Sequence, residues 1–422
     1  EKDRPMTLTP SGKRKMILDV DTGIDDALAL AYLVSFDDVE ILGVIGTYGN
    51  VSADTAVRNT AYVLERLGFR DVPVMCGSTR PSWAAAFIPD AGCAQFHGTD
   101  GLGGFGPSAD CAVGRHTSVC DDSNIQTLNP APNVSDSSGL DVRAMRGLIS
   151  VGGYDVHDPH ANPAADSFSL SFTVCDAGGD NDCEDRSHSP VALPDGVRFL
   201  IDTVRSYGSD VTVVATGPLT DVDAALAAAP DITSRLRLVM MGGTLTQEGN
   251  CWDATTETNI IQDPEAADRV FHSGADVTMV GLDVTHQCLL RSDATLSWRQ
   301  TASQSQDNGG KTADVRTFLA DIADFSIAAN LAADPRLFAA GMPLHDPLAA
   351  AVAVNPSLVE CFDLPMKVET ETGDFHGTRG RTIGDPAGLI DPSAPRVHVA
   401  LTVDHDRFVA DFTRRIAQLA GD

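Results

Sequence analysis

Apolar residues along the chain fall into short continuous runs and into longer stretches at helical spacing, and the two alternate. A run at 16–18 predicts a buried strand, and apolar residues recur at helical spacing over 25–34. A strand over 39–44, a helix over 53–67 and a short strand at 72–75 continue the pattern. Strands that alternate with helices predict an α/β fold, with a mainly parallel twisted sheet flanked by helices.

The pattern stops after residue 81 and resumes near residue 195. The later strands are expected at 211–215, 236–241, 277–280 and 397–403. The later helices are expected at 195–207, up to 229, at 264–272, near 312–331, after 345 and at 406–419. Because the same rhythm continues, both parts are predicted to form a single domain over 16–422, preceded by a polar tail at 1–15.

The segment between the two parts, at about 106–190, has a different composition. Its 85 residues are dominated by Ser, Asp, Asn, Gly and Pro. A stretch of this length without a regular apolar pattern is unusual inside a compact domain. We therefore interpret it as a long, loop-rich insertion and not as a linker between domains.

The net charge of the chain limits the classes of partner that it is expected to bind. The 422 residues include 30 Lys and Arg against 59 Asp and Glu, a formal net charge of −29, and 43% are hydrophobic. This composition is typical of a globular protein. It argues against nucleic acid and anionic membrane surfaces, which bind basic faces. No apolar run reaches the ~18–20 residues that span a bilayer.

The nine cysteines form no CxxC pair and no tight Cys/His cluster, which argues against a structural zinc site. In the insertion, Cys111 lies near Cys120 and Cys175 near Cys183, and both pairs are predicted to form disulfides. The chain also starts at Glu1 without Met, as a processed protein would. We expect a secreted protein, with a cytoplasmic location as the alternative.

Four aspartates surround the point where the first strand ends and the first helix begins: Asp19, Asp21, Asp25 and Asp26. In open parallel sheets, ligands bind at this carboxyl edge. Four like charges repel unless a cation neutralises them, and oxygen ligands favour Ca²⁺ or Mg²⁺ over zinc. Alternatively, Asp25 and Asp26 only complement the helix dipole, although that leaves the other two aspartates unexplained.

The segment Asp19-x-Asp21-x-Gly23-x-Asp25-Asp26 resembles the signature of the calcium-dependent nucleoside hydrolases, the inosine-uridine preferring N-ribohydrolases. Further segments match that family in the same order: 49–50, 97–103, 215–220, 241–243, 249–250, 257–260, 263–267, 281–287 and 345–347. The resemblance extends from residue 16 to about 419, apart from the insertion. It implies the Rossmann-like nucleoside hydrolase fold and a homo-oligomer, with a dimer expected more than a tetramer.

The resemblance also implies the reaction, which is hydrolysis of the N-glycosidic bond of ribonucleosides through an oxocarbenium-like transition state. Ca²⁺ would be held by Asp21, Asp26, Asp346 and the carbonyl of Thr216, and it would bind the attacking water. Asp25 would be the general base that activates this water.

The remaining site residues are assigned on the same resemblance. His345 would protonate the leaving base. The substrate would be bound by Asn50, His97, Asn250, Glu257 and Asn259. Some of these residues also have simpler interpretations, since Asp346 before Pro347 could only cap a helix and His345 could be an ordinary loop histidine.

The sequence also leaves two other functions open. A haloacid-dehalogenase-type phosphatase would use Asp19 as phosphoacceptor with Mg²⁺, but it would leave Asp25 and Asp26 without a role. A secreted calcium- or nucleoside-binding protein on a hydrolase scaffold would have no turnover. Base preference is also open, because the insertion follows directly on the segment 97–103 that borders the substrate in the family.

Overall fold

A computed structural model of the protein describes residues 12–108, 117–118, 120, 193–251, 254–306, 315–372, 378–389 and 391–419. Most of the predicted insertion and of the predicted tail lies outside these residues. Cys111, Cys175 and Cys183 also lie outside them, so the predicted pairing of Cys175 with Cys183 stays a prediction.

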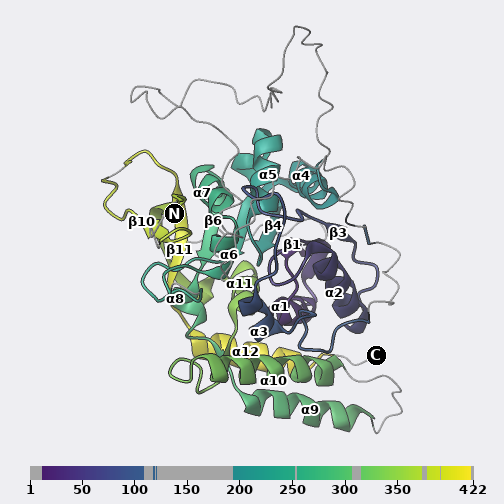
Figure 1. Ribbon diagram of the computed structural model, residues 1–422. Helices are drawn as coiled ribbons and strands as arrows, with labels where there is room; N and C mark the ends of the chain where they lie inside the picture. The colour runs from purple at the N-terminus through teal and green to yellow at the C-terminus, as the bar shows by residue number, and fades with distance from the viewer. Residues whose placement is uncertain are drawn as a thin grey trace, which may run out of the picture. The chain divides into compact units, whose positions relative to one another are not determined.

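A nine-stranded sheet runs through the described residues in the order β10-β9-β11-β6-β5-β4-β1-β2-β3 (Figure 1). The strands are β1 (Arg14–Val20), β2 (Val39–Gly46), β3 (Val74–Cys76), β4 (Val211–Ala215), β5 (Arg237–Met241), β6 (Asp276–Val280), β9 (Val359–Val368), β10 (Thr382–Gly384) and β11 (Arg396–Val403). Every pairing from β3 to β11 is parallel, and only β9 and β10 add antiparallel pairings at one edge. This arrangement confirms the predicted mainly parallel sheet.

Helices cover both faces of the sheet (Figure 1). They are α1 (Ile24–Val34), α2 (Ala53–Arg66), α3 (Ala91–His97), α4 (Asp195–Tyr207), α5 (Thr220–Ala228), α6 (Thr258–Gln262), α7 (Pro264–His272), α8 (Leu282–Thr285), α9 (Ser292–Gln306), α10 (Val315–Ala333), α11 (His345–Val354) and α12 (His405–Ala417). Two short strands, β7 (Leu289–Leu290) and β8 (Met342–Pro343), pair separately from the main sheet.

Two hydrophobic cores lie on opposite faces of the sheet, because successive residues of a strand point to opposite sides. On β1, Leu18 belongs to the core that includes α1, α10, α11 and α12. Its neighbour Ile17 belongs to the core that includes α4, α5 and α7. Burial on both faces explains why these strands appear in the sequence as continuous apolar runs.

The antiparallel edge was not expected from the sequence. β9 contains Asp363 and Pro365, and the first half of the strand is largely exposed. A half-exposed edge strand lacks the continuous apolar run that marks the buried parallel strands. The short helices α3, α6 and α8 were missed as well, since each is too brief to show helical periodicity.

One disulfide joins Cys76, at the end of β3, to Cys120, with Cα atoms 5.3 Å apart. The predicted pairing of Cys111 with Cys120 is therefore wrong. Spacing along the chain suggested it, but the partner was decided by the sheet edge, where Thr117 forms a parallel bridge with Val74. The bridge brings Cys120 beside the end of β3, where Cys76 is its disulfide partner.

The strand order reverses around β1, because β2 and β3 extend from one side of it and β4, β5 and β6 from the other. The chain therefore leaves the carboxyl ends of β1 and β4 in opposite directions and opens a crevice between them. Such a switch point is where ligands bind in open α/β sheets. The aspartates at the end of β1 lie there.

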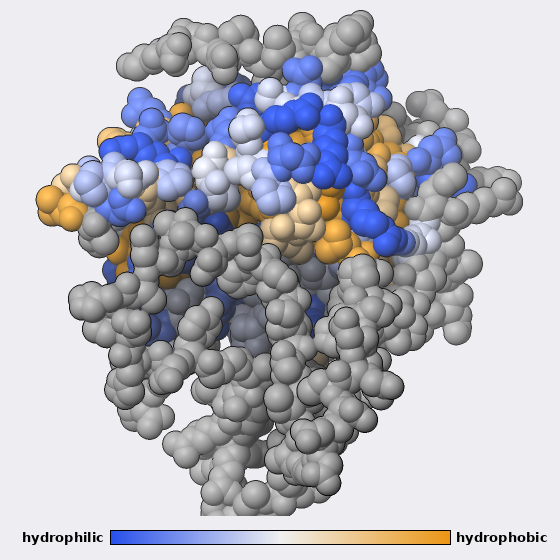
Figure 2. All heavy atoms as spheres, turned by 90° about the horizontal axis from the view of Figure 1, so that it is seen from above, coloured by the Kyte–Doolittle hydropathy of each residue, from blue (hydrophilic) through white to orange (hydrophobic). Residues whose placement is uncertain are grey.

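On the coloured part of the face in Figure 2, hydrophilic side chains form a broad band and apolar side chains lie in patches beside it. Among the described residues, no helix has the length and apolar character needed to cross a membrane.

Candidate active site

Three buried carboxylates converge at the switch point. Asp25 and Asp26 lie in the first turn of α1, and Asp346 lies in the first turn of α11. One oxygen atom from each lies within 4.8 Å of the others, and their side chains are almost completely buried. Because the positive ends of two helix dipoles point toward this group, its negative charge is partly stabilised.

The electrostatics of this group call for a further positive charge. Burial raises the pKa of Asp25 and that of Asp26 to about 6, and it raises the pKa of Asp346 well above the ordinary range. The neighbouring carboxylates raise the pKa of Asp346 further. Asp25 Oδ1 is buried and has no hydrogen-bond donor among the described residues. Closely spaced hard oxygen atoms of this kind could hold a metal ion.

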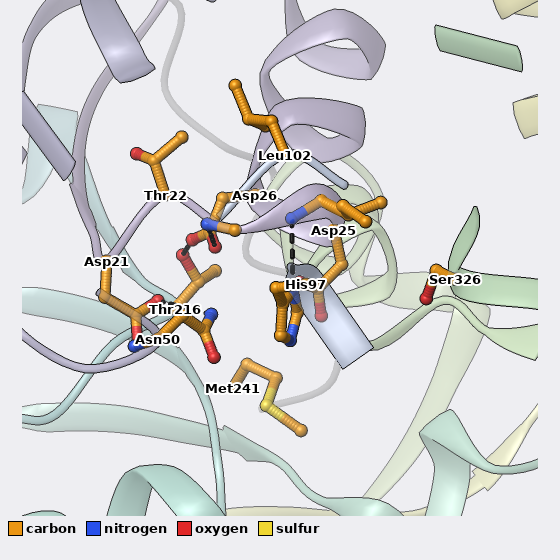
Figure 3. Close-up of polar contacts among 12 residues, drawn as sticks. Asp21, Thr22, Asp25, Asp26, Asn50, His97, Leu102, Thr216, Met241 and Ser326 are labelled. Atoms are coloured by element: carbon orange, nitrogen blue, oxygen red, sulfur yellow. Dashed lines mark hydrogen bonds and ion pairs between the residues drawn. The ribbon is translucent and has the colours of Figure 1, made fainter. Parts of the chain in front are cut away.

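Asp26 links the two strands of the switch point (Figure 3). Its Oδ2 accepts a hydrogen bond from the backbone N–H of Gly23 at 2.8 Å. Its Oδ1 accepts one from the hydroxyl of Thr216 at 2.6 Å, and Thr216 directly follows β4. Asp26 is therefore held in one orientation by both strand ends.

Asp21 lies beside this group and is held by Asn50. Asp21 Oδ2 accepts from the backbone N–H of Asn50 at 2.8 Å, and Oδ1 accepts from Asn50 Nδ2 at 3.1 Å. A Cβ atom on Gly49 would come within 1.9 Å of Asp21 Oδ2, so only glycine permits this contact. Asp25 belongs to the acidic group, and Asp21, a predicted calcium ligand, lies beside it, where the charge of Asp26 acts on it.

Asn259 and Glu257 meet the site at the start of α6. Asn259 Nδ2 donates to the carbonyl oxygen of Thr216 at 2.7 Å. Glu257 caps α6, because its carboxylate accepts from the backbone N–H groups of Asn259, Ile260 and Gly243 at 2.9–3.1 Å. Both residues are therefore part of the framework of the site.

Asn250 lies on the loop before α6, and Asp283 anchors that loop. Asn250 Oδ1 accepts from the backbone N–H and the hydroxyl of Thr258 at 3.0 and 3.1 Å. The carboxylate of Asp283 accepts from the backbone N–H groups of Leu245 and Thr246 at 2.8 and 2.7 Å. Asp283 was not among the predicted site residues, although it lies in the matching segment 281–287.

His97 closes one side of the acidic group (Figure 3). Its Nδ1 accepts from the backbone N–H of Ile24 at 3.1 Å and lies 3.7 Å from Asp25 Oδ1. Burial lowers the pKa of His97 to about 4. The ring is therefore neutral at pH 7, with its proton on Nε2.

His345 lies next to the ligand candidate Asp346 at the start of α11. Its Nδ1 is 2.8 Å from the hydroxyl oxygen of Thr285. Burial lowers the pKa of His345 well below the ordinary value. The ring of His286 lies 5.6 Å from that of His345 and packs against Phe338. Sequence reasoning missed Thr285, because nothing in the chain order connects it to α11.

Asp19 does not join the acidic group at α1. Its side chain is completely buried and interacts with the carboxyl group of Asp221 on α5. Burial and Asp221 raise the pKa of Asp19 well above its ordinary value. Ser78 donates to Asp221 from its backbone N–H and its hydroxyl, both at 2.7 Å. An Asp19 enclosed in this way is a poor phosphoacceptor, which argues against the phosphatase alternative.

The structure thus gathers most of the predicted site residues at one edge of the sheet. Asp21, Asn50 and Thr216 follow the ends of β1, β2 and β4, and Asp25 and Asp26 lie in the first turn of α1. Asn259 and Glu257 lie at the same edge. Asn259 donates to the Thr216 carbonyl, and Glu257 accepts from the backbone N–H of Gly243, just after β5. His97, Asp346 and His345 are contributed by α3 and α11.

Comparison with known proteins agrees with this geometry. Residues 16–410 match the family model of the inosine-uridine preferring nucleoside hydrolases. The chain is 27% identical over 403 residues to a pyrimidine-specific ribonucleoside hydrolase of Citrobacter koseri, covering 95% of this chain and 97% of the relative. A solved purine-preferring ribonucleoside hydrolase from Gardnerella vaginalis is 35% identical with a TM-score of 0.67, covering 96% of this chain and 98% of that one. The chain therefore belongs to the inosine-uridine preferring nucleoside hydrolase family, a family of ribonucleoside N-ribohydrolases.

Proposed function

We propose that this nucleoside hydrolase cleaves the N-glycosidic bond of ribonucleosides with the help of Ca²⁺, releasing free base and ribose. The observation that carries the proposal is the convergence of Asp25, Asp26 and Asp346, all buried, at the switch point of the sheet. Carboxylate oxygens without a His or Cys ligand suit Ca²⁺ better than zinc.

We assign the metal to Asp26, Asp346, Asp21 and the carbonyl of Thr216. Asp26 and Asp346 belong to the converging group, and Asp21 lies beside it. When bound, Ca²⁺ would lower the pKa of a coordinated water and orient the ribose hydroxyls. The hydrogen bond from Asn259 to the Thr216 carbonyl holds that carbonyl in one orientation.

Asp25 is the proposed general base. Its Oδ1 has no hydrogen-bond donor among the described residues, so this oxygen is able to accept a proton from water. As the water oxygen bonds to the anomeric carbon of ribose, the bond from that carbon to the base nitrogen breaks. The electron pair of the broken bond stays on the base, and the water proton moves to Asp25.

His345 is the proposed acid for the leaving base, which takes up a proton as it departs. The lowered pKa of His345 makes its protonated ring a stronger acid, so the ring gives up its proton readily to the departing base. Positive charge develops on the ribose ring in an oxocarbenium-like transition state, and the surrounding carboxylates stabilise it. Attack from the face opposite the base inverts the configuration at the anomeric carbon.

Ribose is proposed to bind to Asn50, Asn250, Glu257 and Asn259, with His97 at the edge of the site. Each of the first four is already bonded to a neighbouring backbone or side-chain group. Such bonds hold the side chains in place before the substrate arrives, and this preorganisation favours catalysis.

The direct test is release of free base from a panel of purine and pyrimidine nucleosides, with and without a chelator, followed by chromatography. Of the two relatives, one is named pyrimidine-specific and the other purine-preferring, so both classes of nucleoside belong in the panel. We expect base release that a chelator abolishes and Ca²⁺ restores. Phosphate release from a phosphoester without base release from any nucleoside contradicts the proposal.

We further propose that the protein is secreted and forms a homodimer, with a cytoplasmic location as the alternative. The disulfide between Cys76 and Cys120 supports secretion, since disulfides persist in oxidising compartments. Peptide mapping of the unreduced native protein tests the disulfide.

Light scattering after gel filtration tests the proposed homodimer, and a monomeric mass contradicts it.

A further inference from the structure

Thr285 contacts the proposed acid directly. It is the last residue of α8, its side chain is fully buried, and its Oγ1 lies 2.8 Å from His345 Nδ1. His345 begins α11, sixty positions further along the chain. The contact therefore joins two elements that the fold, and not the chain order, brings together.

The hydroxyl of Thr285 is held in a defined position. The backbone N–H of Thr285 bonds to the carbonyl of Gly281 at 3.1 Å, which fixes the main chain at the end of α8. A β-branched side chain has few χ1 rotamers in a helix. Because the residue is buried, water does not compete for the hydroxyl. The imidazole of His345 therefore meets a rigid partner.

This contact decides which nitrogen of His345 is available. Nδ1 is engaged by Thr285, whereas Nε2 has no hydrogen-bond partner among the described residues. A hydroxyl is both a donor and an acceptor, so it can bond to Nδ1 whether or not that nitrogen carries a proton. The same contact thus holds the ring in place for either tautomer of the imidazole.

We propose that Thr285 is a positioning residue for His345, whose ring it orients so that Nε2 serves the leaving base. This inference rests on the proposed role of His345 as the acid. It assigns Thr285 no contact with the substrate. Its loss should therefore slow departure of poor leaving groups while ribose binding and the acidic group remain as they are.

Two substrates separate this role from a general structural one. A natural nucleoside needs protonation of its base, whereas the phenolate of a nitrophenyl riboside leaves without a proton. In Thr285→Val, which keeps the shape but lacks the hydroxyl, we expect kcat on the nucleoside to fall about ten- to a hundredfold. Turnover of the nitrophenyl riboside and KM for both substrates should change less than about threefold.

Matched variants complete the test. Thr285→Ser keeps the hydroxyl and should restore nucleoside turnover to within a few-fold of the native enzyme. Thr295 lies on α9, and its buried hydroxyl donates to Asp324 on α10 at 2.6 Å. Thr295→Val removes this hydroxyl and should leave both activities unchanged. If Thr285→Val fails to fold, Thr285→Ala takes its place with the same expectation.

The outcomes distinguish this inference from the proposed function. If His345→Ala lowers nucleoside turnover but the Val and Ala variants at Thr285 do not, the positioning role is overturned and the proposed function stands. An equal loss on both substrates also overturns the positioning role, because it indicates general disruption. Absence of base release and of nitrophenol release in the native protein contradicts the proposed function itself.

Discussion

Asn259 and Thr216 are joined by a hydrogen bond of 2.7 Å from the side-chain amide of Asn259 to the carbonyl of Thr216. Thr216 uses its hydroxyl at the same time to bond to Asp26. One residue after β4 thus connects a member of the acidic group with a proposed ribose ligand. Metal affinity and ribose binding are therefore expected to be coupled through Thr216.

The first prediction concerns this coupling. Asn259→Ala removes the donor that orients the Thr216 carbonyl, so calcium affinity should fall about 10- to 100-fold, as is typical when a group that orients a metal ligand is lost. Isothermal titration calorimetry with Ca²⁺ measures the calcium affinity. Ribose binding should weaken as well, and the KM for a nucleoside measures that loss. Unchanged calcium affinity would show that the carbonyl of Thr216 does not bind the ion.

Removal of calcium should also lower the stability of the protein. Without a cation, three buried carboxylates repel one another, so a chelator should decrease the melting temperature. Ca²⁺ at about 100 times its Kd should add about 2.7 kcal/mol to the free energy of unfolding. Differential scanning calorimetry at several Ca²⁺ concentrations measures this, with Mg²⁺ and Zn²⁺ for comparison.

Asp346→Asn and Asp26→Asn should weaken the calcium effect on stability. Asp223→Asn is the matched control, since Asp223 on α5 is largely buried and pairs with Arg269 on α7 at 2.7 Å. The control should lower stability without changing calcium affinity. A larger stabilisation by zinc than by calcium contradicts the proposed metal.

Asp25 and Asp21 can be distinguished by separate measurements. Asp25→Ala should retain calcium binding but lose turnover about 10²- to 10⁴-fold, because it removes the proposed base. Asp21→Ala should lose calcium affinity, because Asp21 is a proposed ligand. Since Asp25 lies in the acidic group and Asp21 beside it, the reverse result would exchange the two roles.

The loop that carries Asn250 should depend on Asp283. Asp283→Ala removes the acceptor for the N–H groups of Leu245 and Thr246, so the loop is released. We expect KM for nucleosides to rise about tenfold or more with a smaller change in kcat. Asp283→Asn keeps one acceptor oxygen and should give an intermediate KM. Equal losses of kcat in both variants would contradict an anchoring role.

A surface histidine far from the site should make stability depend on pH. His398 Nδ1 lies 2.6 Å from Asp363 and its Nε2 lies 3.4 Å from Asp276, and these carboxylates raise its pKa to about 9. Because the folded pKa exceeds the unfolded value of about 6.5, the stabilisation is present in full below that pH. It is lost as the pH rises through about 9.

Urea unfolding at pH 6 and at pH 10 measures this effect. The native protein should lose more stability between the two values than His398→Gln does. The side chain of His398 is 42% exposed, so solvent screening limits the difference to less than about 1 kcal/mol. High salt should reduce it further, and a difference that is independent of salt contradicts an ionic origin.

Much of the fold could be predicted from the sequence because buried parallel strands are apolar on both faces. β4 at Val211–Ala215 and α7 at Pro264–His272 lie where the pattern predicted them. β9 was missed because its exposed half carries Asp363 and mixes polar with apolar residues. The predicted disulfide partner of Cys120 was wrong for a related reason, since a contact across a sheet edge cannot be inferred from the spacing of cysteines along the chain.

By itself, the sequence determined that aspartates stand at the end of β1 and at the start of α11, and the family resemblance assigned them roles. Only the tertiary structure decided which carboxylates meet. Asp25, Asp26 and Asp346 converge, while Asp19 turns to the opposite face of the sheet and meets Asp221. The physical reason is that the pleat of β1 and the packing of α11 and α5 set the directions of side chains. Residue spacing along a chain does not contain those directions.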